Sequence, residues 1–158
     1  MNIFYLDHDP QKAAEYQCNK HVVKMILESA QLLSTTHYVF KSVYLDVLYK
    51  PTHINHPCSI WVRQSHQNYN WLYQHYEALC DEYTWRYGKS HKSESLSSLL
   101  KKCPVLENKP SKPALAMPDE FKVDCPVESY RNYYRHKSKS IKMVWPHGQT
   151  PDFMKELI

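Results

Sequence analysis

The chain has 158 residues, 42% of them hydrophobic, and a formal net charge of +4. Enough apolar surface is present for a packed core, which excludes an intrinsically disordered chain. No apolar run approaches the roughly 20 residues that span a bilayer, so we expect no membrane-spanning segment. The opening residues lack the basic and apolar regions of a secretion signal, and we therefore expect a cytoplasmic protein.

Cysteine, glycine and histidine usage narrows the class of protein further. The five cysteines are scattered and odd in number, which favours reduced thiols over a disulfide framework. Only two glycines are present, so neither a P-loop nor a Rossmann phosphate loop can be built. His53 and His56 have no further cysteine or histidine at metal-ligand spacing. We expect no metal ion and no cofactor.

The first helix is predicted to begin at Asp9 and Pro10, an N-cap residue followed by proline at the first helical position. An apolar face with helical spacing continues from there to about Thr36. Residues 37–50 have no clear period, and the pattern leaves helix, strand and loop open for them.

A polar loop over residues 51–57 ends at a proline that favours a second helix start. The apolar pattern then predicts a long helix to about Tyr87, with Gly88 as the C′ residue that follows it. We expect this helix to be broken near Asn68–Asn70, because asparagine side chains compete with the helix backbone.

The last third of the sequence alternates short helices with irregular chain. A short helix is predicted over residues 93–102, another over 126–136 and a last one from residue 151. Between the first two, residues 104–118 contain four prolines and no periodicity, which predicts a wrapping loop. The sequence therefore predicts an all-α fold: a compact single-domain helical bundle over residues 1–158, with long irregular loops.

Beside its apolar face, the first predicted helix carries a polar stripe. Spacings of three and four residues place its members on one continuous face. The stripe consists of His21, Lys24, Glu28, Gln31 and Thr35. A carboxylate between a lysine and an imidazole can accept a proton or stabilise a cation. We predict Glu28, His21 and Lys24 as catalytic residues; a solvated salt-bridge network is the alternative.

Three further segments indicate contacts with a nucleotide or a phosphate. Polar side chains precede the second helix, whose free N–H groups suit an anion. Cations are interleaved with aromatic rings over residues 83–92 and again over 130–137, a pattern that suits phosphates and bases. Helix capping and core packing are the alternatives for these segments. The predicted nucleotide- or phosphate-binding residues are Lys20, Asn55, His56, Arg63, Arg86, Lys89, Lys92, Tyr130, Arg131 and Tyr134.

The run Cys-Asn-Lys-His-Val-Val-Lys-Met-Ile-Leu-Glu, residues 18–28, resembles the first-helix signature of pyrimidine-dimer DNA glycosylases of the phage endonuclease V type. His21 and Glu28 keep the spacing of that family's histidine and catalytic glutamate. The Tyr-rich segment over residues 130–134 is also similar in kind and order. In addition, the chain resembles a group of phage proteins that share its His-Val-Val-Lys-Met stretch and its Ala-Met-Pro-Asp-Glu segment, residues 116–120.

The resemblance implies an all-α fold, extrusion of a base from the duplex, and cleavage of the glycosidic bond by an amine that forms a Schiff base. It implies that Glu28 steadies the sugar cation and that His21 contacts the substrate. DNA is the partner that this family implies.

Two departures from the family pattern bear on the mechanism. The family's nucleophile is the α-amine of a small residue exposed by removal of the initiator methionine, whereas Asn2 favours retention of Met1. The family's arginines around the glutamate are replaced by Leu27 and Gln31. Either another amine, such as that of Lys24, attacks the sugar, or the lyase chemistry is lost.

The sequence thus supports two main hypotheses. One is a DNA glycosylase that excises a damaged or modified pyrimidine, with or without a Schiff-base lyase step. The other is a non-catalytic phage protein with an anti-defence role, which sequesters a phosphorylated nucleotide that serves as an immune signal. A surface for a protein partner is a third alternative. The oligomeric state is open and includes a homo-oligomer.

Overall fold

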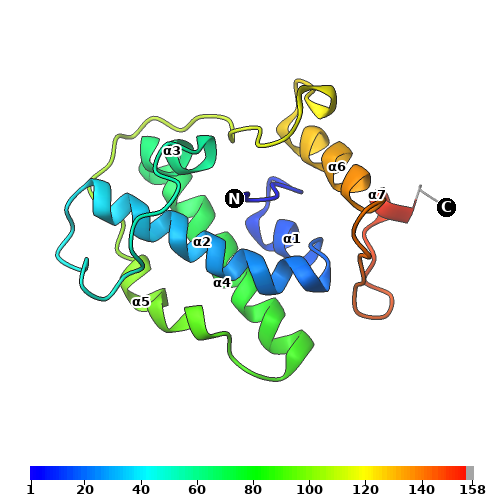
Figure 1. The fold of residues 1–158 in the computed structure, drawn as a ribbon, viewed down its shortest axis with the longest axis horizontal. Coiled ribbons are helices and arrows are strands. Elements are labelled where there is room, and N and C mark those ends of the chain that lie inside the picture. Colours follow the sequence, from blue (N-terminus) through cyan, green and yellow to red (C-terminus); the bar gives the residue numbers. More distant parts are fainter. Residues whose placement is uncertain (156–158) are drawn as a thin grey trace.

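The computed structural model describes residues 1–155, and every regular element in this part of the chain is helical, which confirms the all-α prediction (Figure 1). The α-helices are α1 (Pro10–Glu15), α2 (Asn19–Val39), α3 (Pro57–Gln64), α4 (His66–Tyr87), α5 (Ser97–Leu100), α6 (Pro126–Lys137) and α7 (Asp152–Lys155). Two 3-10 turns, η1 (Lys92–Leu96) and η2 (Asp119–Phe121), complete the set. Within the described residues, no helix is long and apolar enough to cross a membrane.

The single helix predicted from residue 10 to residue 36 is instead two helices. α1 ends at Glu15 and α2 begins at Asn19, with Cys18 in an extended conformation as the N-cap. The prediction was wrong here because contacts from distant parts of the chain stabilise the break. Trp145 donates its indole N–H to the carbonyl of Tyr16, 129 residues away in sequence.

The long second helix is also broken, but not where the asparagines predict. Ser65 is extended, with φ −154° and ψ 157°, and its side chain accepts the backbone N–H of Asn68 to cap α4. Asn68 itself lies inside α4, where its amide donates to Trp61 and to Ser111. The amide therefore joins α3, α4 and the long loop rather than breaking the helix. Gly88 ends α4 in the left-handed conformation, φ 70°, as predicted.

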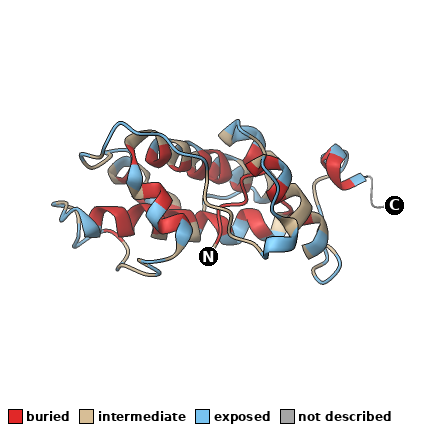
Figure 2. Cartoon of the chain, turned by 90° about the horizontal axis from the view of Figure 1, so that it is seen from above, coloured by how far each residue is buried: buried red, intermediate tan, exposed pale blue. Residues whose placement is uncertain are grey.

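α2 and α4 pack against each other and form the centre of the molecule (Figure 1). Buried and exposed residues alternate along the helices (Figure 2), as expected for amphipathic helices around one core. The first residues of the chain also enter the core, since Ile3 and Leu6 are fully buried. The start of the chain is therefore held beside α2 and does not extend into solvent.

The proline-rich segment after α5 wraps across the molecule and links α3 and α4 to α6 (Figure 1). Trp61 donates to the carbonyl of Ser111, and the backbone N–H of His66 donates to the carbonyl of Glu107. Tyr130 of α6 donates its hydroxyl to the carbonyl of Ala114. These contacts satisfy backbone groups that an irregular segment would otherwise leave unpaired.

Candidate functional site

A pocket of about 160 Å³ lies between the start of the chain, α2 and α6. The first three residues of the polar stripe of α2, His21, Lys24 and Glu28, form one wall, because residues three and four positions apart point in the same direction on a helix. Gln31 and Thr35 are not among the residues that line the pocket. The lining residues are Met1, Asn2, Phe4, His21, Lys24, Met25, Glu28, Tyr133, Lys137 and Ile141.

Asn2 fixes the path of the chain into this pocket. Its side-chain carbonyl accepts the backbone N–H groups of Ile3 and Phe4, at 2.7 and 2.9 Å. Its amide donates to the carbonyl of Ala116 at 2.9 Å. Phe4 adopts φ 46°, a conformation that residues other than glycine rarely take. The strained backbone places the Phe4 ring in a stack on His21, with the ring centroids 4.6 Å apart.

Glu28 lies within ion-pair distance of two amines. Its Oε1 is 3.8 Å from the α-ammonium of Met1 and 4.0 Å from Nζ of Lys24. The Glu28 side chain is 13% exposed, and its Oε2 is buried with no hydrogen-bond partner among the described residues. A buried carboxylate oxygen without a hydrogen-bond partner destabilises the folded state. Such groups are rare in proteins, and a role in ligand binding or catalysis is one reason for them.

His21 is a buried member of the stripe, and its hydrogen-bond partner bears on where its ring proton lies. The Tyr134 hydroxyl accepts the backbone N–H of Cys18 at 2.8 Å and lies 2.8 Å from Nδ1 of His21. We assign the hydroxyl as the donor to Nδ1, and in this tautomer the neutral ring carries its own proton on Nε2. Burial, followed by the charges of Lys137 and Lys24, lowers the pKa of His21 to about 4, so the ring is neutral at physiological pH.

Positive charge exceeds negative charge around the pocket. The α-ammonium, Lys24 and Lys137 face one carboxylate, that of Glu28. Nζ of Lys137 lies 5.3 Å from the centre of the Tyr133 ring, at the α6 wall. Such a surplus suits an anionic ligand, because lysine ammonium groups bind phosphate as point charges. Within the described residues, no group of three or more His, Cys, Asp and Glu side chains could hold a metal ion.

The structure brings together the three residues predicted as catalytic, since His21, Lys24 and Glu28 all line the pocket. Tyr134, predicted as a nucleotide contact, is fully buried and touches the site through His21. Lys20 is exposed on the same helix and is absent from the pocket wall that the structure describes.

Residues of the loop before α3 lie outside the pocket. Arg63 donates to the carbonyl of Ile54 at 2.6 Å and to the hydroxyl of Ser59, and it lines a different cavity. His56 caps α3 by accepting the backbone N–H of Cys58, and Asn55 is exposed. The pKa of His56 is lowered by burial first and by the α-ammonium second, so this residue is still within range of the site's charge.

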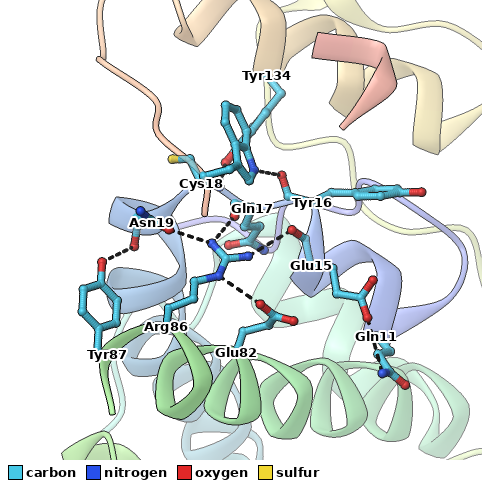
Figure 3. A network of polar contacts seen from close by, with 11 residues as sticks. Gln11, Glu15, Tyr16, Gln17, Cys18, Asn19, Glu82, Arg86, Tyr87 and Tyr134 are labelled. Atoms are coloured by element: carbon cyan, nitrogen blue, oxygen red, sulfur yellow. Dashed lines mark hydrogen bonds and ion pairs between the residues drawn. The ribbon is translucent and has the colours of Figure 1, made fainter. Parts of the chain in front are cut away.

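Arg86 points from α4 into the turn between α1 and α2 (Figure 3). It donates to the carbonyls of Glu15 and Gln17, to the side chain of Asn19, and to Glu82, at distances between 2.8 and 3.1 Å. Its side chain is only 2% exposed. The geometry is that of a structural arginine that stabilises the helix break.

The other predicted phosphate contacts are divided between core and surface. Tyr130 is fully buried with its hydroxyl bound to the proline-rich loop. Arg131 donates to the carbonyl of Leu6 at 2.9 Å and lies over the Phe153 ring. The remaining two are exposed, outside the Glu28 pocket: Lys89 and Lys92.

Sequence reasoning missed the α-amine of Met1, and it also missed Phe4 and Lys137. A retained methionine still carries an α-amine. The α-amine nucleophile of the family could therefore have been used to predict that Met1 lies at the site. Lys137 shares a helix face with Tyr134 at i, i+3, which gave a weak signal. No local pattern marks Phe4, because its position depends on the bonds of Asn2.

The family model described as pyrimidine dimer DNA glycosylase matches residues 1–95, which is 95 of 158 residues. The chain therefore belongs to the pyrimidine dimer DNA glycosylase family. The match includes the start of the chain and the whole α2 stripe, whereas the α6 wall lies outside it. Comparison with curated proteins and with solved structures gave no match.

Proposed function

We propose that the protein is a DNA glycosylase that removes a damaged or modified pyrimidine, with Glu28 and an adjacent amine as the catalytic groups. One observation carries this proposal: the α-ammonium of Met1 and Nζ of Lys24 lie 3.8 and 4.0 Å from the same Glu28 oxygen. A carboxylate beside primary amines, in a pocket with surplus positive charge, is the arrangement that Schiff-base chemistry on DNA requires. Membership of the family supports the reaction class.

In the proposed reaction, the attacking amine first gives up a proton, which Glu28 can accept. The amine nitrogen then bonds to C1′ of the deoxyribose while the bond from C1′ to the base nitrogen breaks. The departing base keeps that electron pair and takes up a proton. Opening of the sugar ring gives an iminium, which water hydrolyses to an abasic site. Loss of a C2′ proton from the iminium would instead expel the 3′ phosphate, which is the lyase outcome.

The two amines differ in how firmly they are held. The Met1 side chain is 3% exposed and the neighbouring Asn2 is anchored by its hydrogen bonds, whereas the Lys24 side chain is 67% exposed. A nucleophile must be held close to the reacting atom, because orientation supplies much of the rate enhancement. We therefore assign the attack to the α-amine and the binding of a phosphate to Lys24. This assignment needs a protein that begins at Met1, which intact-mass spectrometry checks.

The rest of the pocket supports binding of an extruded nucleotide. Nε2 of His21 carries a proton that it can donate to a sugar or phosphate oxygen. Lys137 adds a second flexible cation from α6, and the Phe4 and Tyr133 rings offer faces for a base. Proteins that act on a base extrude it from the duplex into such a pocket.

Borohydride trapping on duplex oligonucleotides that contain a pyrimidine dimer or an oxidised pyrimidine tests the proposal. We expect a covalent adduct on the N-terminal peptide, which digestion and mass spectrometry identify. Lys24→Arg keeps the charge without a trappable amine and should still give the adduct, whereas a short N-terminal extension should abolish it. Absence of both an adduct and base release on every substrate would refute the glycosylase proposal.

Sequestration of a phosphorylated nucleotide without catalysis is the second candidate. The surplus of cations around Glu28 supports it, since this charge would hold a free nucleotide as well as a DNA phosphate. Heat denaturation after incubation with nucleotides would release them unchanged in this case. Tight binding to duplex DNA with a steep salt dependence would favour the glycosylase instead.

A further inference from the structure

A second cavity, of about 380 Å³, lies where α2 ends, and it shares no lining residue with the Glu28 pocket. His37 follows Glu28 by nine positions on α2, which places the two sites about 14 Å apart along the helix axis. The lining residues are His37, Phe40, Ser42, Tyr44, Lys102, Cys103, Pro104 and Val105. Its volume falls in the range of small-molecule sites, about 300–1,000 Å³.

His37 lines this cavity, and one of its ring nitrogens is a buried acceptor without a partner among the described residues. The Tyr69 hydroxyl donates to the carbonyl of Leu100 at 2.6 Å, so it must accept the N–H of His37 Nε2, 2.9 Å away. Nδ1 of His37 is then an unprotonated acceptor. The residue is 1% exposed, and its Nδ1 has no hydrogen-bond partner among the described residues.

An unpaired buried acceptor is unfavourable, and a ligand that donates a hydrogen bond to it would offset part of this cost. The acceptor is available at neutral pH, because burial lowers the pKa of His37 to about 4. The ligand edge that meets His37 must therefore carry an N–H or O–H group.

Aromatic rings and one cation form the outer part of the cavity. Phe40 is 46% exposed. The Tyr44 ring is 6.0 Å from the His37 ring in an edge-to-face arrangement, and Nζ of Lys102 lies 5.0 Å from the Tyr44 ring centre. Exposed rings beside a lysine suit a flat ligand that carries an anionic group.

We propose that this cavity binds a free nucleoside monophosphate, whose base donates an N–H to Nδ1 of His37 and whose phosphate meets Lys102. A nucleotide combines the three required features: a flat ring, an N–H donor on its edge, and an anion. Half of the lining, residues 102–105, lies beyond the segment that matches the family. The site is separate from the glycosylase proposal and does not depend on it.

Isothermal titration of the full-length protein with adenosine monophosphate tests the site. A second titration uses the N6,N6-dimethyl analogue, which lacks the amino N–H donor. We expect the analogue to bind about tenfold more weakly, the effect of one lost hydrogen bond to a buried acceptor. Two variants test the protein side: His37→Gln retains a donor toward Tyr69 but removes the acceptor at the Nδ1 position, and Lys102→Met removes the cation. Each should weaken binding about tenfold.

Thermal melting shows whether His37→Gln remains folded. Should it unfold, nucleotide binding is measured with Lys102→Met and Phe40→Ser, both at exposed positions, and each should weaken it. Three results would overturn the proposal: no binding at millimolar nucleotide; equal affinity of the two ligands; or binding that survives these changes but is lost in Lys137→Met. The last result would move the nucleotide to the Glu28 pocket. Protection of the cavity residues by duplex DNA with no binding of the monophosphate would also count against it.

Discussion

Arg86 and Glu28 are both charged and largely shielded from water, but their surroundings differ. Arg86 makes four hydrogen bonds to fixed oxygen atoms, and its side chain is 2% exposed (Figure 3). Glu28 has two amines near one oxygen, and its other oxygen has no partner among the described residues. The Arg86 guanidinium makes its hydrogen bonds within the protein, whereas one oxygen of the Glu28 carboxylate can still accept a hydrogen bond from a ligand.

This difference separates a structural charge from a candidate catalytic one. From the sequence, Arg86 and Glu28 were both placed in polar clusters, and Arg86 was predicted to bind phosphate. A buried charge with complete partners stabilises the local structure, and removal of a partner is costly. A buried charge that lacks some of its hydrogen-bond partners destabilises the fold, and such groups are found more often at functional sites. Four predictions test this distinction.

Replacing Glu28 should have the largest effect. Glu28→Gln keeps the shape of the side chain but removes the proton acceptor, and base release should fall about a thousandfold. The melting temperature should change little, because the contacts of Glu28 with the two amines are long, at 3.8 and 4.0 Å, and the amide keeps the shape of the side chain. Glu107→Gln, at an exposed position away from the pocket, is the matched control. Full activity of Glu28→Gln in a single-turnover assay would show that the carboxylate is not catalytic.

Replacing Arg86 should act on stability. Arg86→Met leaves two backbone carbonyls and Glu82 without their partner, and the free energy of unfolding should fall by about 3–5 kcal/mol. Lys122→Met removes an exposed ion pair with Asp119 and should change the stability little, because solvent screens such pairs. Urea denaturation measures both. An equal, small loss in the two variants would mean that the Arg86 network contributes little.

Acid should destabilise the protein through three buried histidines: His21 at the pocket, His37 at the second cavity, and His75 beneath the Arg86 turn. His75 is fully buried between the side chain of Gln17 and the carbonyl of Pro10, each at 3.0 Å. Burial is the main cause that lowers the pKa of each of the three rings from 6.5 to about 4. Between these values the unfolded chain binds more protons than the folded one, so stability is present above pH 6.5 and is lost as the pH falls toward 4.

The three rings together should cost about 5 kcal/mol of stability between pH 7 and pH 5. Urea titrations at these two pH values measure the loss. His75→Gln should make the pH dependence shallower, whereas His147→Gln, at an exposed position, should leave it unchanged. A stability that is flat between pH 7 and pH 5 would contradict the neutral state of these rings.

The smallest effect is expected from Tyr134. Tyr134→Phe removes the hydroxyl between Cys18 and Nδ1 of His21, so the His21 proton is no longer fixed on Nε2. We expect base release to fall about tenfold, the equivalent of about 1.4 kcal/mol. Nitrogen chemical shifts of His21 should report a mixture of tautomers in the variant and one tautomer in the native protein. An unchanged single tautomer in the variant would refute a positioning role for Tyr134.

Helical periodicity predicted most of what lies within single elements. The spacing of His21, Lys24 and Glu28 was sufficient to predict one face, and these residues do line one pocket. The C-terminal end of α4 at Gly88 also followed from its residue type. These features depend on residues a few positions apart, and local sequence carries that information.

The helix breaks could not be predicted from local sequence. Residues 16–18 continue a plausible helical pattern, but Arg86 and Trp145 bind the carbonyls that the break frees. Similarly, Asn68 would favour a break in isolation, yet its amide joins α4 to the loop at Ser111. In both places tertiary hydrogen bonds outweigh an intrinsic preference of less than about 1 kcal/mol per residue.

By itself, then, the sequence determined the helical class and the chemical character of the α2 stripe, because both follow from the spacing of side chains along one element. Only the tertiary structure decided which groups meet Glu28. The α-amine of Met1 and the Lys137 side chain are far apart in sequence, and their approach depends on the bond from Asn2 to Ala116 and on the packing of α6. Long-range contacts of this kind are set by the fold as a whole, since no short segment encodes its distant partner.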